Sequence, residues 1–191
     1  MKYLFMTLFA LAVLLPIRGV AASDDRSLIS QGQKLERSGN IAGALSFYEE
    51  ALKKELQPGT RRTFLNRCSM FSRGREKKLA FLNQALLITG ANPTEHYRTF
   101  WLLGQMHLRT APDKALGYFL NLENEKKIAA SLVCTGYFEA GKIMEAKKNK
   151  NKALEFYRKS LAAGKSVPWR YDFSGPAKAV ERLEKELEES K

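Results

Sequence analysis

The chain has 191 residues, of which 45% are apolar, so it is long enough to bury a core as one domain or as one short array of repeats. Its formal net charge is +12, a surplus that often accompanies nucleic-acid binding. Its two cysteines cannot form a zinc site by themselves, which leaves a disulfide or two free thiols.

The first 22 residues have the features of a secretory signal peptide. Lys2 supplies a positive start, residues 3–15 are an apolar run, and small residues precede Ser23, where signal peptidase would cut. The run is shorter than the roughly 20 residues that span a bilayer, which favours cleavage over an uncleaved anchor. We therefore predict a periplasmic or secreted protein, which would rarely meet nucleic acid. The basic surplus then suits anionic lipids, acidic cell-wall polymers or an acidic partner protein, or is only a solvated surface.

One short motif recurs along the rest of the chain. The segment ALSFYEEAL begins at Ala44, and ALEFYRKSL, which begins at Ala153, is identical to it at five of nine positions. Segments with the same apolar rhythm begin at Lys78 and Ala115, so the starts are 34, 37 and 38 residues apart. An amphipathic segment and a turn precede each copy. A period of this length indicates stacked helical hairpins.

The small and bulky positions of this motif resemble those of tetratricopeptide (TPR) repeats. Gly32 and Ala44, like Gly141 and Ala153, stand where the two antiparallel helices of a unit must approach closely. In the second unit Asn66 takes the place of the small residue. The resemblance implies an all-α fold: a TPR-like right-handed α-solenoid of about four helix-turn-helix repeats plus a C-terminal capping helix.

The predicted organisation follows from these positions. Residues 1–22 are the signal peptide, and residues 23–166 form the TPR-like array, with repeats at about 25–58, 59–92, 95–126 and 128–166. Residues 167–191 are a linker and the capping helix, since Ser174 resembles a helix start and the apolar spacing continues to Leu187. Such a cap would cover the last repeat and present a polar outer face.

No residues at the spacing of a metal site, a phosphate-binding loop or a catalytic triad are found in the sequence. His96 and His107 are the only histidines, and no Cys, Asp or Glu arrangement accompanies them. We therefore predict no enzyme activity, no cofactor and no metal. Cys68 and Cys134 fall in the first helices of the second and fourth units, too far apart for a disulfide, whose Cα atoms lie within about 7 Å. Two unpaired, largely buried thiols are expected.

The resemblance also implies a concave groove lined by the first helices of the units. The residues carried over to the groove are Arg37, Arg67, Arg98, Trp101, Gln105, Arg109, Phe138 and Lys142, together with Gln33, Thr63, Met70 and Glu145. They predict a non-enzymatic scaffold that binds a protein or peptide partner, one with acidic residues, in a basic groove that contains aromatic side chains.

Other interpretations of these residues stay open. The two groove aromatics could serve packing between repeats, and the arginines could be solvated charge. For the whole protein, the alternatives are electrostatic attachment to an anionic envelope polymer or lipid surface, which salt would weaken, and a role as accessory subunit of an envelope enzyme.

Overall fold

The computed structural model describes residues 22–189 except 91, 122–126, 166 and 168–173. These described residues form nine helices and no strand, which confirms the predicted all-α class. The helices are α1 (Ala22–Arg37), α2 (Ile41–Ala51), α3 (Pro58–Phe71), α4 (Arg75–Leu86), α5 (Pro93–His107), α6 (Pro112–Phe119), α7 (Ala130–Ala146), α8 (Lys150–Gly164) and α9 (Ser174–Glu188). The predicted signal peptide lies outside the described residues, apart from Ala22.

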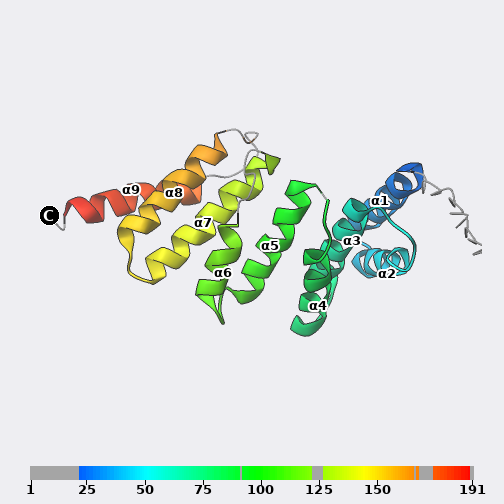
Figure 1. Cartoon of the computed structure of the whole chain (residues 1–191). Coiled ribbons are helices and arrows are strands. Elements are labelled where there is room, and N and C mark those ends of the chain that lie inside the picture. The colour runs from blue at the N-terminus through cyan, green and yellow to red at the C-terminus, as the bar shows by residue number, and fades with distance from the viewer. Residues whose placement is uncertain (1–21, 91, 122–126, 166, 168–173, 190–191) are drawn as a thin grey trace, which may run out of the picture.

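The helices form an array that runs in one direction (Figure 1). Each helix contacts the next one in the chain, α3 also contacts α5, and α5 also contacts α7. The first hairpin lies at one end of the array and α9 at the other. Four hairpins, α1–α2, α3–α4, α5–α6 and α7–α8, are thus followed by a single helix, as the repeat pattern predicts.

Glycines allow the two helices of a hairpin to approach closely. A Cβ atom at Gly32 would lie 2.2 Å from the ring of Tyr48, and one at Gly141 would lie 2.4 Å from the ring of Tyr157. Both rings are buried, with 1% of each tyrosine exposed. Because real Cβ contacts are never this short, each tyrosine occupies space that only a glycine in the facing helix leaves open.

The third hairpin keeps this arrangement, whereas the second departs from it. In the third, Phe119 packs over Gly104, where a Cβ would lie 2.5 Å from the ring. In the second, Asn66 is fully buried and its amide bonds to the next hairpin. Its Nδ2 donates to the carbonyl of Glu95 at 3.1 Å, and its Oδ1 accepts from the hydroxyl of Thr99 at 3.0 Å. The residue that breaks the sequence pattern therefore links two hairpins.

The first and fourth turns share one capping arrangement. Asn40 and Asn149 each accept a hydrogen bond from the backbone N–H three residues later, at 2.9 and 3.1 Å. The residue before each asparagine has positive φ: 76° at Gly39 and 60° at Lys148. Glycine adopts this conformation without a steric penalty, whereas lysine does not. The fourth turn therefore keeps a strained residue that the first turn avoids.

Three arginines cap helix C-termini. Arg61 donates to two carbonyls that follow α2, at 3.1 and 2.8 Å. Arg62 is 1% exposed and donates to carbonyls at the end of α4, one of them at 3.2 Å. Arg75 donates to a carbonyl at the end of α5. Cations at the negative ends of helix dipoles stabilise the array, so part of the basic surplus is structural.

Candidate functional site

The histidines and cysteines take packing positions. The His96 ring lies 5.0 Å from that of Phe100, and burial is the main cause that lowers the pKa of His107. Cys68 and Cys134 are free and buried, which confirms the predicted unpaired thiols. Burial raises the pKa of Cys68 to about 12 and also raises that of Cys134, so neither thiol ionises readily.

Across the part of the chain that the structure describes, no three His, Cys, Asp or Glu side chains come together in a way that could hold a metal ion. Within the same residues, no helix has both the length and the apolar character needed to cross a membrane. The candidate site is therefore sought on the surface that the first helices of the hairpins share.

Predicted groove residues from the third and fourth hairpins lie close together. Trp101 and Phe138 are half-buried and both pack against the core formed by these hairpins and α9. The Nζ atom of Lys142 lies 5.0 Å from the centre of the Phe138 ring and 2.7 Å from the carboxylate of Glu139. Gln105 is partly exposed on α5. The two aromatics thus do serve packing between repeats, and each still has an exposed portion.

The predicted groove arginines differ in their pairing. Arg67 lies 3.4 Å from the carboxylate of Glu36, and Arg98 lies 3.2 Å from a carboxylate one turn earlier in α5. Arg37 and Arg109 are exposed, and neither forms an ion pair within the described residues. With Lys142 also paired, three of the five basic candidates have a carboxylate neighbour. The groove is therefore less uniformly basic than its arginines and lysine suggest by themselves.

The first hairpin contains a bonded pair that the sequence argument missed. The carboxylate of Glu36 accepts a hydrogen bond from the Tyr48 hydroxyl at 2.6 Å, and Glu145 accepts one from Tyr157 at 2.9 Å. Burial raises the pKa of both tyrosines, and the glutamates raise it further. The signal was in the sequence, because the two glutamates are 109 residues apart, the same offset as the two tyrosines.

The last helix continues this arrangement. Arg182 in α9 donates to Glu145 at 2.7 Å, as Arg67 of the second hairpin pairs with Glu36. Arg182 also bonds to Glu186 at 3.0 Å, and both glutamates raise its pKa. By this pairing α9 occupies the place that the first helix of a fifth repeat would take.

A cavity of about 400 Å³ opens between the end of α5, the start of α6 and the C-terminal half of α7. Its walls are Leu108, Pro112, Glu139, Lys142, Ile143, Ala146 and Lys147. Only Lys142 among them was predicted from the sequence. The Oε2 atom of Glu139, one of these walls, is buried and lacks a hydrogen-bond partner among the described residues. Apolar walls beside unsatisfied polar atoms are typical of binding sites.

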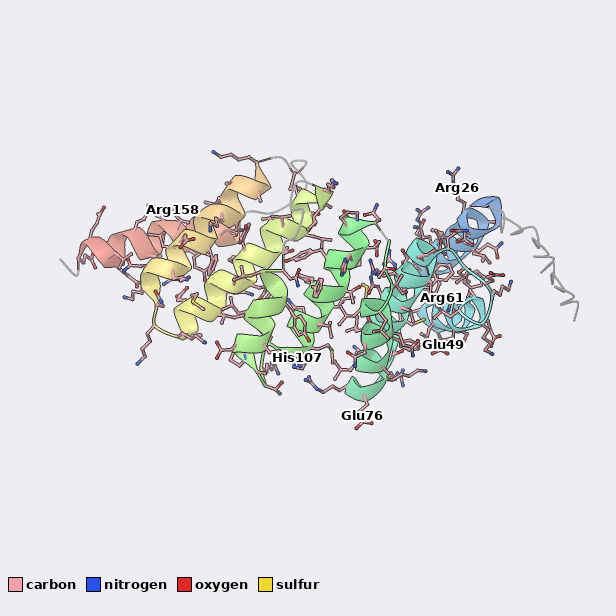
Figure 2. The ribbon with its side chains drawn as sticks, viewed as in Figure 1. Arg26, Glu49, Arg61, Glu76, His107 and Arg158 are labelled. Carbon is pink, nitrogen blue, oxygen red and sulfur yellow. The ribbon has the colours of Figure 1, made fainter. Side chains whose placement is uncertain are left out.

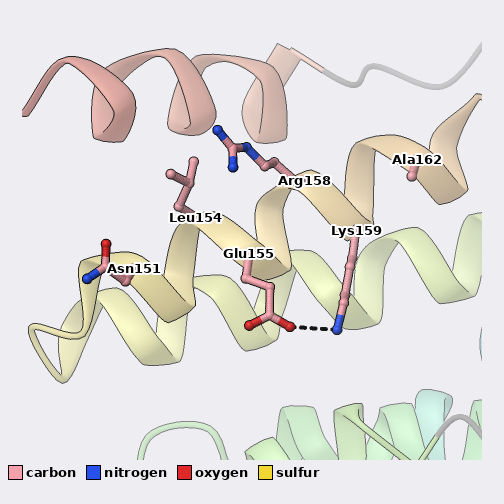
Figure 3. Close-up of a pocket in the computed structure, with 6 residues that line it drawn as sticks. All are labelled: Asn151, Leu154, Glu155, Arg158, Lys159 and Ala162. Atoms are coloured by element: carbon pink, nitrogen blue, oxygen red, sulfur yellow. Dashed lines mark hydrogen bonds and ion pairs between the residues drawn. The ribbon is translucent and has the colours of Figure 1, made fainter. Parts of the chain in front are cut away.

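A second cavity of about 470 Å³ lies on the outer face of α8 (Figure 3). All its lining residues come from this one helix: Asn151, Leu154, Glu155, Arg158, Lys159 and Ala162. Lys159 pairs with Glu155 at 2.7 Å, and Arg158 reaches Glu184 of α9 at 2.6 Å. A depression on one helix offers a ligand few converging groups, so the α5–α7 cavity is the stronger candidate.

No family model and no curated protein matches the chain. Among solved structures it is similar to one titled "Crystal structure of MamA", a TPR-like protein, with a TM-score of 0.51 and 16% sequence identity. The similarity covers 83% of this chain and 95% of that one. The fold is a TPR-like solenoid. An identity this low shows the fold alone.

Proposed function

We propose that this protein is an exported, non-enzymatic scaffold that binds a segment of a partner protein in the groove formed by α1, α3, α5 and α7. The observation that carries the proposal is the α5–α7 cavity, which lies where the first helices of two hairpins stand next to each other. The N-terminal sequence pattern supports export. An exported chain would seldom meet nucleic acid, and we propose none as a partner.

The chemistry of the cavity suits a peptide that carries both apolar and acidic side chains. Leu108 and Ile143 offer apolar walls to an anchoring side chain. Lys142, on the same wall, and the exposed Arg109 attract carboxylates. The buried oxygen of Glu139 can accept a backbone N–H from the bound segment, which removes the cost of leaving a buried acceptor unpaired.

Site-specific cross-linking tests the groove. A photo-cross-linking amino acid at Gln105 or Met106, on α5, should cross-link a discrete partner protein in intact cells. The same amino acid at Asn151 or Ala162, on the outer face of α8, should not. Equal cross-linking from both faces would contradict the groove, and recovery of a chain that still carries residues 1–22 from the cytoplasm would contradict export.

Charge reversal provides the matched comparison. Arg109→Glu combined with Lys142→Glu should abolish the cross-link from Gln105, because both cations face the proposed acidic segment. Lys165→Glu combined with Lys178→Glu changes the net charge equally at exposed positions away from the groove. The control variant should retain the cross-link. If the control variant lost the cross-link and the groove variant kept it, the groove would not hold the partner.

A further inference from the structure

Positive charge is concentrated along one edge of the array, where the two helices of each hairpin are joined. We define this turn edge as the last four residues of each first helix, the turn, and the first four residues of the second helix: 34–44, 68–78, 104–115 and 143–153. These segments contain twelve Lys and Arg but four Asp and Glu, a net charge of +8.

The opposite edge is nearly neutral. The segments that join one hairpin to the next helix, taken by the same rule, are 48–61, 83–96, 116–133 and 161–177. Their described residues contain five Lys and Arg and four Asp and Glu, a net charge of +1, close to zero. Most of the chain's surplus of +12 therefore comes from the turn edge alone.

The second, third and fourth turns lie along one side of the molecule. Arg75 in the second turn donates to a carbonyl at the end of α5, so the second and third turns are in contact. Lys147 in the fourth turn pairs with Asp113 in the third. Figure 2 shows Glu76 and His107, at the start of α4 and the end of α5, along the same lower side.

Most of these cations face solvent without a carboxylate partner. Eight of the twelve are exposed and form no ion pair within the described residues: Lys34, Arg37, Arg73, Arg75, Arg109, Lys114, Lys148 and Lys152. Since the charges recur at every hairpin along the edge, their fields add over a length that a single charged patch would not cover.

Two of the three exposed large apolar side chains among the described residues belong to the turn edge, whereas Leu87, 82% exposed, belongs to the opposite edge. Ile41 is 40% exposed in the first turn and Met70 is 39% exposed at the end of α3. A soluble polyanion would engage the cations alone. A lipid surface engages both kinds of side chain, because phosphates bind the cations while apolar groups enter the headgroup boundary.

We propose that the turn edge docks on a surface of anionic phospholipids. Lysines and arginines of the four turns bind headgroup phosphates, and Ile41 and Met70 enter the interface. The turn edge includes walls of the α5–α7 cavity such as Leu108 and Ile143, so docking by this edge places that cavity next to the lipid surface. The proposal does not depend on the occupant of the groove.

Vesicle sedimentation of the full chain tests the edge. The parent should bind phosphatidylcholine vesicles that contain phosphatidylglycerol, and high salt should release it. An edge variant removes four cations that lie outside the predicted groove: Arg73→Gln, Lys114→Gln, Lys148→Gln and Lys152→Gln. Its partition onto these vesicles at low salt should fall by at least about tenfold, since each cation near an anionic surface contributes to binding.

The control variant loses the same number of charges elsewhere: Arg26→Gln, Lys54→Gln, Lys165→Gln and Lys178→Gln. All four side chains are exposed and lie outside the turn edge. Its partition should fall by less than about threefold, because charges beyond the screening length of about 10 Å contribute little. Every variant keeps the same N-terminal apolar run, so that segment cancels in the comparison.

Three results would overturn the proposal. One is an equal loss in the edge and control variants, which would show that only net charge matters. Another is parent binding that is the same with and without phosphatidylglycerol. The third is edge-dependent binding to duplex DNA but not to vesicles, which would make the edge a polyanion site. The edge variant should keep its groove cross-link from Gln105, so failure here is separate from failure of the groove.

Discussion

The first and second hairpins meet the same packing requirement with different residues. In the first, a glycine lies beneath a large ring, so that Gly32 leaves the space that Tyr48 fills. At the equivalent positions of the second stand Asn66 and Leu82, both buried. In the second hairpin the apolar side chain of Leu82 is smaller than that of Tyr48, and the facing residue, Asn66, is larger than Gly32. The position occupied by Gly32 in the first hairpin and by Asn66 in the second can thus allow close approach within a hairpin or hydrogen bonding between hairpins.

The fourth hairpin shows which of these arrangements the chain uses at its end. It repeats the first in its glycine, tyrosine, glutamate and asparagine, but α9 replaces the next hairpin. Arg182 then supplies the cation that Arg67 supplies to the first hairpin. The capping helix therefore supplies the same arginine–glutamate pair that the first helix of a following repeat would supply.

The largest expected effect tests the close approach. Gly32→Ala should lower the free energy of unfolding by about 2–4 kcal/mol, because the buried Tyr48 ring must shift. Gly117→Ala is the control, since nothing lies within 4 Å of a Cβ there, and it should raise that free energy by up to about 1 kcal/mol. Urea unfolding measures both. Tyr48→Leu, which copies the second hairpin, should restore part of the loss, and equal stability of the two alanine variants would refute the close approach.

The second prediction concerns the hydrogen bonds between hairpins. Asn66→Gly restores the residue of the first hairpin but should lower the free energy of unfolding by about 2–3 kcal/mol, because the bonds to Glu95 and Thr99 are lost. Asn83→Gly, at an exposed position of α4, isolates the cost of glycine in a helix, about 0.5 kcal/mol. Chemical unfolding of both variants measures the two changes in unfolding free energy. Equal effects would mean that Asn66 only fills space.

The third prediction concerns the tyrosine–glutamate bond and its pH dependence. Tyr157→Phe should lower the free energy of unfolding by about 1 kcal/mol at neutral pH, since the bond to Glu145 is lost. Burial raises the pKa of Tyr157 above its ordinary value of 10.0. Above that pH the unfolded state loses the proton first, so the parent loses stability as pH rises. The Tyr157→Phe variant has no hydroxyl to ionise at this position, so it does not lose stability in this way.

The difference between parent and variant should therefore shrink between pH 7 and strongly alkaline pH. Unfolding curves at both pH values measure it. Tyr118→Phe on α6, where the structure gives the hydroxyl no bond to a glutamate, serves as the control and should change stability little at neutral pH. A difference in unfolding free energy between parent and Tyr157→Phe that grows with pH would contradict the assignment of the Tyr157–Glu145 bond.

The smallest effect tests the turn residue with positive φ, which is Gly39 in the first hairpin and Lys148 in the fourth. Lys148→Gly should raise the free energy of unfolding by about 0.5–1 kcal/mol, because glycine adopts positive φ without strain although it gains entropy in the unfolded chain. Gly39→Lys should lower it by a similar amount. Thermal unfolding of the reciprocal pair measures both, and a destabilised Lys148→Gly would show that the side chain outweighs the strain.

Much of the fold was predictable because its causes are local or periodic. The spacing of Gly32 and Ala44, repeated at Gly141 and Ala153, predicts paired helices, and the structure confirms four hairpins and a last helix. The free thiols followed from the same register. Asn66 was identified as a departure, but its bonds to the third hairpin were not foreseen, since its partners lie about thirty residues away.

The groove was less predictable. Family positions selected residues such as Arg67 and Arg98, but a position on a helix face does not reveal which carboxylate comes near it. Their pairing with acidic neighbours depends on how adjacent helices stack. The cavity walls were missed for a related reason: Leu108, Pro112 and Ile143 come from three different helices and share no spacing in the sequence.

The amino-acid sequence by itself determined the number of hairpins and the small residues between the helices of the first and fourth, because these depend on a recurring period. Only the tertiary structure decided where the charges act. Stacking brought the second, third and fourth basic turns together on one side, and it turned three arginines into helix caps. Electrostatic neighbours are set by distance in space, which a linear pattern does not contain.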